Sequence, residues 1–511
     1  MSDPPPASSA ADERNFDAEL EYTYGFFPFL KADSLMLNAL LAGVRPPGAQ
    51  GSITYCELGC GQGLTLSILA AGDESGRYVG IDYNPAQITN ASALAREAGL
   101  DNVEFIEESF ANLQARDLPD FDIVVLHGIY SWISPKLRHD IVEFLNRKLK
   151  PAGLCFVSYN CAIGRASDLA FRQLLQAALR REGTPSPGAI AKSLAVADAF
   201  AEKGARYFAQ NTATLDRLKD ARTRDPVYVF HEYFNPVWTP FFFHEVAAEM
   251  AEAQLTYVGS TSVAWNYPDL AVPGNLRAIF ESFPAPADQE LLKGIWANQP
   301  FRRDLYVKGA RSVMSPDEQI ASLQALHFGL SRPRADCPLK VNVPAGVANL
   351  PDKPFIPLLD ALEKSPVSGA ELRRHLPPGA VGDQDFVRAL IILLGAEYLE
   401  LRTAPGQLAT VRRRFDRVNA TIARATDRSQ DIFVVATPKN RLAIRMNPMS
   451  YYLYRAHQTG PDNRVGKAYR LLEESGRSVQ YKGRPAPDRK TAEAVLAEQE
   501  SVFVSNTLPR L

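Results

Sequence analysis

The sequence predicts an α/β protein: a Rossmann-like sheet of seven strands with a helical insertion, followed by a C-terminal α+β domain. Three observations support this prediction. Apolar strands alternate with helices in the first half of the chain, a glycine-rich loop follows the first strand, and an acidic residue ends the second strand. With 511 residues, the chain is long enough for two or three domains.

The first strand, loop and helix lie within residues 53–84, ITYCELGCGQGLTLSILAAGDESGRYVGIDYN. The stretch begins with a short apolar run, as in a buried parallel strand. Gly59, Gly61 and Gly63 then permit a tight turn and let a ligand approach the backbone. A second strand ends at Asp82, whose carboxylate can accept both hydroxyls of a ribose. The stretch is therefore expected to bind a nucleotide-like cofactor.

The glycine spacing narrows the choice of cofactor. The motif reads E-x-G-x-G-x-G, with Glu57 two residues before Gly59, whereas a dinucleotide fingerprint reads G-x-G-x-x-G. This loop resembles the cofactor loop of class I S-adenosylmethionine (SAM) methyltransferases, in which the acidic residue orients the methionine end. The resemblance implies that Glu57, the three glycines, Asp82 and the adjacent Tyr83 bind SAM. A plain glycine turn is the alternative.

A third strand is expected at residues 103–106, and in class I methyltransferases the positions after this strand contact the adenine. Many members of that superfamily have an aspartate there. This chain has Ser109, with Phe110 beside it. We assign both residues to the cofactor site, with Phe110 packing on the adenine ring.

The fourth strand, 121–126, ends in His-Gly-Ile-Tyr-Ser-Trp. Ligands of an open α/β sheet lie at the carboxyl ends of the strands, so this loop is expected to face the methyl group. We place His127 at the cofactor, although a strand-end histidine can also be purely structural. Tyr130 and Trp132 are expected to form a wall around a sulfonium or a substrate amine, with core packing as the alternative.

Longer motifs point to a narrower family. These are HGIYSWIS at 127–134, VSYN at 157–160, HEYFN at 231–235 and FRRD at 301–304. They resemble the bacterial methyltransferases that carry a methyltransferase regulatory domain, a group that includes the rickettsial protein lysine methyltransferases. The resemblance covers residues 22–309. It implies a SAM-dependent methyltransferase (EC 2.1.1.-) whose acceptor is a protein lysine amine. The alternatives are a small-molecule N- or O-methyltransferase and a SAM-binding regulatory protein.

Methyl transfer from a sulfonium requires alignment of the acceptor and exclusion of water, and it needs no metal. A lysine acceptor must also lose a proton, because its amine has a pKa near ~10.4. The loops after the fourth and fifth strands face the ligand, so we expect the catalytic pocket there. The candidates are Tyr130, Trp132, Tyr159 and Asn160, with Glu232 as a further proton acceptor.

The predicted domain organisation has five parts. They are a disordered tail (1–15), the SAM-binding core (16–160), a helical insertion (161–235), the completion of the sheet with the regulatory region (236–330) and a winged-helix-like domain (350–511). The insertion is expected to be either a cap over the active site or a dimerisation element, so a homodimer is possible.

Two segments of the first half are expected to border the site. Residues 16–30 are dense in aromatic side chains and are interrupted by glycine and proline, which predicts either a strap on the core or a lid over the cofactor. Residues 265–299 are rich in proline and separate the last two strands of the sheet. We expect this excursion to shape the substrate entrance.

The C-terminal domain is predicted from the order of its elements. Short helices at 355–362, 370–376 and 384–394 precede a strand at 398–402, an order that resembles a winged helix. Arginines at 412–414 and 417 add local positive charge, but acidic residues are spread through the same half. A winged helix that packs on protein is therefore favoured over a nucleic-acid reader.

Composition limits the remaining classes. The formal net charge of −2 argues against a nucleic-acid binder held by overall charge. Five cysteines without a C-x-x-C pair favour a reducing compartment, and the start of the chain lacks the pattern of a secretory signal. No apolar run reaches the ~18 residues of a membrane span. These features predict a cytoplasmic protein.

Overall fold

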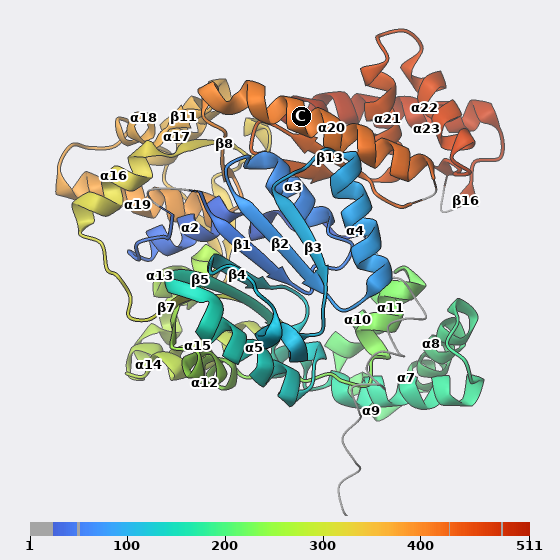
Figure 1. The fold of residues 1–511 in the computed structure, drawn as a ribbon, viewed down its shortest axis with the longest axis horizontal. Coiled ribbons are helices and arrows are strands. Elements are labelled where there is room, and N and C mark those ends of the chain that lie inside the picture. The colour runs from blue at the N-terminus through green and yellow to red at the C-terminus, as the bar shows by residue number, and fades with distance from the viewer. Residues whose placement is uncertain (1–23, 49–51, 429, 482–483) are drawn as a thin grey trace, which may run out of the picture.

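The computed structural model describes residues 24–48, 52–428, 430–481 and 484–511. A central sheet has helices on both faces, a helical lobe protrudes beside it, and the C-terminal helices lie across one side (Figure 1). The predicted α/β fold with a seven-stranded sheet is confirmed. The tail predicted for 1–15 lies outside the described residues. In the described ranges, no helix is long and apolar enough to cross a membrane.

The seven strands follow the order β3-β2-β1-β4-β5-β7-β6, and β7 alone runs antiparallel to its neighbours β5 and β6. They are β1 (Thr54–Leu58), β2 (Arg77–Asp82), β3 (Val103–Glu107), β4 (Phe121–Leu126), β5 (Leu149–Asn160), β6 (Leu255–Ser260) and β7 (Phe301–Lys308). The strand order reverses between β1 and β4. In an open α/β sheet, the crevice for a ligand forms at such a reversal, outside the carboxyl ends of the strands.

Apolar helices cover both faces of the sheet. On one face, α2 (Ala32–Leu41) and α3 (Leu64–Gly72) pack against inward side chains of β1, β4 and β5. On the other face, α5 (Pro135–Lys148) and α12 (Phe243–Glu252) do the same. The helix α4 (Pro85–Glu97) follows β2, and Asn84 caps its N-terminus. Successive strand residues therefore point to two separate apolar cores.

The helical insertion is a small lobe with its own apolar core, which includes Phe171, Leu194 and Phe230 (Figure 1). Its helices are α6 (Ala162–Arg165), α7 (Asp168–Glu182), α8 (Pro187–Glu202), α9 (Arg206–Gln210), α10 (Thr212–Ala221) and α11 (Pro226–Tyr233). Arg165, just after β5, forms ion pairs with Asp168 of α7 and Glu232 of α11. These pairs connect α7 and α11 to α6, the first helix after β5. The role of the lobe as a cap or a dimerisation element stays a prediction.

The excursion between β6 and β7 folds into short helices. They are α13 (Pro268–Ala271), α14 (Arg277–Glu281) and α15 (Pro286–Ala297). Lys293 of α15 donates to the Trp265 carbonyl at 3.0 Å and so closes the excursion on itself. Both ends of the segment, near Trp265 and Gln299, return to the carboxyl edge of the sheet.

The first part of the C-terminal half builds a small mixed unit around the sheet β11-β8-β12. Its elements are α16 (Pro316–Ala325), β8 (His327–Leu330), β9 (Lys340–Val343), β10 (Gly346–Asn349), α17 (Asp352–Lys364), β11 (Val367–Ser368), α18 (Gly369–Arg373), α19 (Ala380–Gly395) and β12 (Leu399–Leu401). Because β8 precedes residue 331, this sheet spans the boundary expected at 331–350. The helix order matches the predicted one, and the winged helix stays a prediction.

The second part of the C-terminal half packs directly on the core. It consists of α20 (Leu408–Asp427), β13 (Val434–Thr437), β14 (Leu442–Arg445), α21 (Pro448–Gln458), α22 (Arg464–Glu474), β15 (Gln480–Tyr481), β16 (Arg484–Pro485) and α23 (Arg489–Val502). Arg414 of α20 donates to the carbonyls of Ala70 and Ala71 at 3.1 Å, and Arg417 donates to Ala98 at 3.1 Å. These arginines therefore cap the C-termini of α3 and α4, where cations are stabilising. Figure 1 shows α20 beside these two helices.

Candidate functional site

The glycine loop between β1 and α3 has a left-handed backbone at three positions. Gly59, Gly61 and Gly63 have φ of +73°, +54° and +66°. The Gly59 and Cys60 amides donate to the Ile81 carbonyl at 2.8 and 3.1 Å, which fixes the loop against the end of β2. A positive φ favours glycine, so all three predicted glycines are needed for the backbone itself.

Close contacts separate these glycines into two kinds. A Cβ on Gly59 would lie 2.5 Å from Ile129, and one on Gly63 would lie 2.5 Å from Ala91. A Cβ on Gly61 would meet nothing closer than 3.5 Å, the side-chain oxygen of Gln87. Gly59 and Gly63 are therefore required for packing, while Gly61 leaves space at the surface that a cofactor is expected to occupy.

Gly63→Ala is expected to lower the free energy of unfolding by at least about 2 kcal/mol, because a left-handed alanine and a crowded Cβ both cost energy. Chemical denaturation measures this loss. Gly43→Ala is the matched control: Gly43 has φ +70° with no atom within 4 Å of a Cβ. The control should lose only about 1 kcal/mol, and equal losses in the two variants would contradict the packing role of Gly63.

One oxygen of the buried Glu57 side chain, Oε2, has no hydrogen-bond donor among the described residues. Glu57 lies in β1 with 5% exposure. Burial, and then the charge of Asp82, raises the pKa of Glu57 to about 8. A buried acceptor without a partner costs free energy, and a cationic ligand group would remove that cost. Glu57 therefore fits the ammonium of an amino acid.

Asp82 lies at the carboxyl end of β2 and connects the glycine loop to α4. Its Oδ2 accepts the Gly61 amide at 2.9 Å and its Oδ1 accepts the Asn84 amide at 3.1 Å. A carboxylate has about four lone-pair positions, so both oxygens can accept further hydroxyl donors. Tyr83 is half-buried beside it. This geometry suits a ribose.

The two residues predicted at the adenine have different surroundings. The Ser109 hydroxyl accepts the Ala111 amide at 3.4 Å and so caps the short helix η2 (Phe110–Ala115). Phe110 is buried in the core beneath α5. Both lie just after β3, as expected, and their contacts to a cofactor stay predictions.

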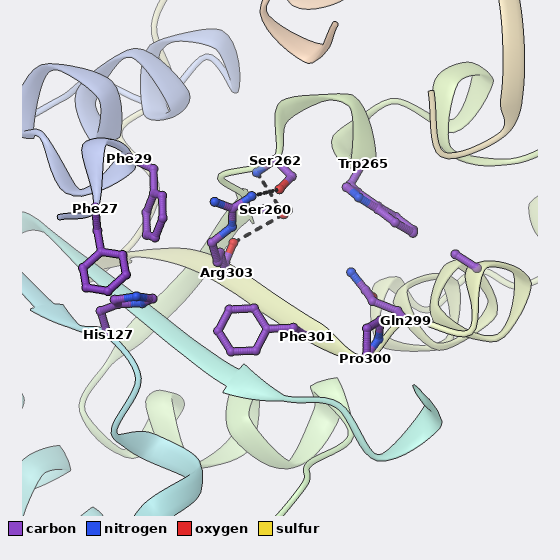
Figure 2. A pocket seen from close by; sticks show the side chains of 11 residues that line it. Phe27, Phe29, His127, Ser260, Ser262, Trp265, Gln299, Pro300, Phe301 and Arg303 are labelled. Atoms are coloured by element: carbon purple, nitrogen blue, oxygen red, sulfur yellow. Dashed lines mark hydrogen bonds between the residues drawn. The ribbon is translucent and has the colours of Figure 1, made fainter. Parts of the chain in front are cut away.

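A cavity of about 440 Å³ opens where β4 and β6 end and the antiparallel strand β7 begins (Figure 2). Five of its eleven lining side chains are aromatic. Among the described residues, Arg303 is the one charged side chain of the wall, and no carboxylate lines it. The lining residues are Phe27, Phe29, His127, Ser260, Ser262, Trp265, Ala297, Gln299, Pro300, Phe301 and Arg303. Phe301 is 39% exposed, so the cavity is open to solvent.

His127 connects this cavity to the glycine loop. Its ring lies 4.3 Å from the Phe27 ring, and the Phe27 amide donates to Thr65 Oγ1 at 3.2 Å, at the start of α3. Burial, and then the charge of Arg303, lowers the pKa of His127 to about 4, so its ring is neutral at pH 7. The described part of the aromatic segment at 16–30 thus forms a wall of the cavity through Phe27, and residues 16–23 lie outside the described residues. The role of this segment as a strap or a lid stays a prediction.

The neutral ring of His127 lies beside the Ser158 hydroxyl. Ser158 Oγ accepts the Gly128 amide at 3.0 Å and lies 2.9 Å from His127 Nδ1. The serine hydroxyl can donate its hydrogen to Nδ1 or accept one from it, because its oxygen has a second lone pair. When it donates, the ring carries its proton on Nε2 and His127 is a hydrogen-bond donor toward a ligand.

Two predicted catalytic tyrosines are buried with carboxylate partners. The Tyr130 hydroxyl donates to Glu249, which also accepts from Arg138 at 3.2 Å. The Tyr159 hydroxyl donates to Asp304 at 2.7 Å. Both hydroxyls lie on the α5 side of the sheet, whereas Phe156 and the cavity lie on the α2 side. Their predicted catalytic roles are untested.

The other three predicted catalytic residues lie on different elements. The Trp132 and Trp238 rings are tilted toward each other, with their centres 6.4 Å apart. The Arg172 guanidinium lies 5.3 Å from the centre of the Trp132 ring. Glu232 is paired with Arg165 inside the insertion. Asn160 ends β5, and its backbone amide donates to Ser131 Oγ at 2.9 Å. Asn160 and Ser158 are two positions apart on β5, so their side chains point to the same face of the sheet. Since Ser158 contacts the cavity residue His127, Asn160 is the one of the three on the cavity side.

Sequence reasoning missed Arg303, Ser262 and Trp265 as cavity residues. A signal was present in the FRRD motif: two adjacent arginines on one strand must point to opposite faces. One arginine, Arg302, pairs with buried carboxylates, while Arg303 faces the cavity. Among the described residues, no group of three or more His, Cys, Asp or Glu side chains has the arrangement of a metal site.

Comparisons with known proteins match this chain to two methyltransferase family models. The family model described as "Methyltransferase domain" matches residues 50–190, and the one described as "Predicted methyltransferase regulatory domain" matches residues 225–308. The uncharacterized protein sll1526 of Synechocystis sp. is 31% identical over 470 residues, which cover 91% of this chain and 92% of that protein.

Solved structures share the fold over almost the whole chain. PKMT2 from Rickettsia typhi in complex with AdoHcy superposes with a TM-score of 0.67 at 19% sequence identity, covering 95% of this chain and 98% of that one. A second structure of the same rickettsial protein gives a TM-score of 0.63 at 18% identity. The shared fold therefore includes the insertion and the C-terminal half as well as the sheet.

Proposed function

Because the chain belongs to the class I SAM-dependent methyltransferases that carry a methyltransferase regulatory domain, we propose that it methylates a lysine amine of a protein. The observation that carries this proposal is the open aromatic cavity beside the glycine loop. The likeness to PKMT2 over nearly the full chain supports a protein acceptor.

The residues of the glycine loop fit SAM. Glu57 Oε2 has no donor among the described residues, and we assign it to the ammonium of the methionine end. Gly61 leaves space for the cofactor to approach the backbone, and Asp82 has the acceptors for the ribose hydroxyls. SAM supplies an electrophilic methyl group on a sulfonium sulfur.

The cavity contributes orientation and a low-polarity environment. Phe27, Phe29 and Phe301 provide apolar walls for the methylenes of a lysine, which would align the amine and exclude water. Among the described residues that line the cavity there is no carboxylate, so an ammonium ion would find no charged partner there, and the Arg303 guanidinium would repel it. Burial in such a wall lowers the pKa of an amine. The acceptor would therefore enter in its neutral, nucleophilic form after losing its proton to solvent.

The test uses purified protein and isotopically labelled SAM with a bacterial protein extract. We expect the label to appear in proteins, as a mass increase on lysine side chains in peptide mass spectrometry. The Asp82→Ala variant serves as the control for background labelling. Labelling of small molecules alone, or of protein side chains other than lysine, would contradict the lysine proposal.

A small-molecule acceptor is the second candidate, and one observation favours it. A volume of about 440 Å³ lies within the range of pockets that enclose small ligands, about 300–1,000 Å³. In that case label would appear in the small-molecule fraction of the extract and protein labelling would stay at the level of the control.

Ligand binding is expected to release a proton from Glu57. At pH 7 the pKa of about 8 keeps this carboxyl mostly protonated before binding. A bound ammonium favours the carboxylate, so the affinity for S-adenosylhomocysteine should rise from about pH 6 to pH 8 and level off above that, with release of up to one proton.

Titration calorimetry in two buffers of different ionisation enthalpy measures this release, because the observed heat then depends on the buffer. Glu57→Gln is the control and should bind without a buffer-dependent heat. A wild-type heat that is the same in both buffers, with a flat pH profile of affinity, would contradict the assignment of Glu57.

A further inference from the structure

Arg302 and Arg303 are adjacent in β7 but have opposite electrostatic surroundings. Arg302 is 4% exposed and pairs with Asp304 and Glu290, each at 2.9 Å. Arg303 faces the other side of the sheet, toward the cavity. Among the described residues, no carboxylate lies within the 4.0 Å of an ion pair from its guanidinium. Within the part of the chain that the structure describes, Arg302 is thus neutralised by ion pairs and Arg303 is not.

The guanidinium of Arg303 is held in place by two contacts. Its Nη2 donates to Ser262 Oγ at 2.9 Å, and its carbon lies 4.6 Å from the centre of the Phe29 ring (Figure 2). These contacts use one of five N–H donors and leave the others for a ligand. Burial lowers the pKa of Arg303, and the charge of Glu397 acts in the opposite direction. The Glu397 carboxylate is 85% exposed and lies 3.7 Å from Arg332.

A second donor points to the same kind of ligand. His127 lines the same cavity, and its neutral ring carries a hydrogen on Nε2 when Ser158 donates to Nδ1. A planar guanidinium beside a neutral N–H donor, within aromatic walls, is complementary to a carboxylate attached to an apolar group. Among the described lining residues, an ammonium would find no carboxylate to pair with.

We infer that Arg303 binds a carboxylate of the methyl acceptor and so selects acceptors that carry a negative charge close to the methylated atom. In a protein acceptor this would be an acidic side chain near the lysine; in a small molecule it would be the compound's own carboxylate. The inference rests on the proposed function only in assigning the cavity to the acceptor.

The test measures binding of phenylacetate and of its neutral analogue phenylacetamide to the full chain saturated with S-adenosylhomocysteine. Saturation of the cofactor site excludes competition with the cofactor's own carboxylate. Ligand-observed NMR then gives both affinities. We expect phenylacetate to bind at least about tenfold more tightly than the amide, since a charge-assisted pair is worth about 1.5–3 kcal/mol.

Arg303→Met should remove this preference and leave the affinity for S-adenosylhomocysteine within about twofold, because a tenfold loss needs about 1.4 kcal/mol. Ser262→Ala, which frees the guanidinium, should give a smaller loss. The matched control is Arg45→Met, since Arg45 is exposed and paired with Glu318 away from the cavity. The unchanged cofactor affinity also shows that the variants are folded.

Three results would overturn the inference: equal binding of phenylacetate and phenylacetamide, no binding of either, or retained preference in Arg303→Met. A parallel loss of cofactor affinity in Arg303→Met would also overturn it, because the carboxylate would then belong to the cofactor. None of these measurements needs turnover, so they fail independently of the lysine proposal. Once binding is established, inhibition of protein labelling by phenylacetate would assign the carboxylate to a protein acceptor, and lack of inhibition would assign it to a small molecule.

Discussion

Asp82→Ala is expected to weaken binding of S-adenosylhomocysteine by two to four orders of magnitude. The buried carboxylate ends β2, and its two oxygens already position the amides of Gly61 and Asn84. Its remaining acceptors are those we assign to the ribose. Two charge-assisted hydrogen bonds at about 1.5–3 kcal/mol each account for the expected loss.

Titration calorimetry with S-adenosylhomocysteine measures this loss, and circular dichroism checks that the variant is folded. Asp82→Asn keeps the shape and one acceptor oxygen, so we expect it to fall between alanine and wild type. The control is Asp117→Ala, an exposed aspartate before β4. Wild-type affinity in a folded Asp82→Ala protein would remove the ribose assignment.

The nucleotide half of the fold was predictable because its signals are local. The glycines, the strand before them and Asp82 lie within 30 residues, and each has a conformational reason that is visible in the sequence. In the structure the Gly61 amide donates to the Asp82 carboxylate, and the Gly59 amide donates to the carbonyl of the preceding residue, Ile81. Both ends of the excursion at 265–299 line the cavity, and its predicted role at the substrate entrance stays a prediction.

The C-terminal arginines were harder to interpret, because their partners are far away in sequence. The run at 412–414 indicated a charged patch. In the structure Arg414 caps a helix that ends more than 300 residues earlier, and it also donates to Asn102 Oδ1 at 2.7 Å. Helix C-termini attract cations wherever the chain brings them together, and no local pattern reveals which helix will be met.

The acceptor side of the site was only partly predictable for a related reason. His127 was predicted, from its position after β4, to lie at the cofactor; it lines the cavity that we assign to the acceptor, and its contact with the cofactor stays a prediction. Arg303 depends on the antiparallel pairing of β7 with β5 and β6, which decides which face each residue takes. A shift of one residue in that register would exchange Arg302 and Arg303. Sequence alone therefore suggests the pair of arginines but not their assignment.

Asp304→Ala is expected to lower the free energy of unfolding by about 3–5 kcal/mol, the cost of breaking a buried ion pair from one side. Asp304 is fully buried and accepts from Arg302 Nε at 2.9 Å and from the Tyr159 hydroxyl at 2.7 Å. Its loss would leave Arg302 with Glu290 as the remaining carboxylate partner and would leave the Tyr159 hydroxyl without its acceptor.

Urea denaturation measures this loss, and two variants test its cause. Asp360→Ala removes a 52% exposed partner of Arg334 and should cost no more than about 1 kcal/mol. The double variant Arg302→Met/Asp304→Leu replaces the pair with apolar side chains, and it should recover much of the loss because no charge is left buried alone. If the double variant lost, relative to wild type, as much stability as the sum of the losses of Arg302→Met and Asp304→Leu measured singly, the two residues would act independently, and the buried ion pair would not be the cause of the loss in Asp304→Ala.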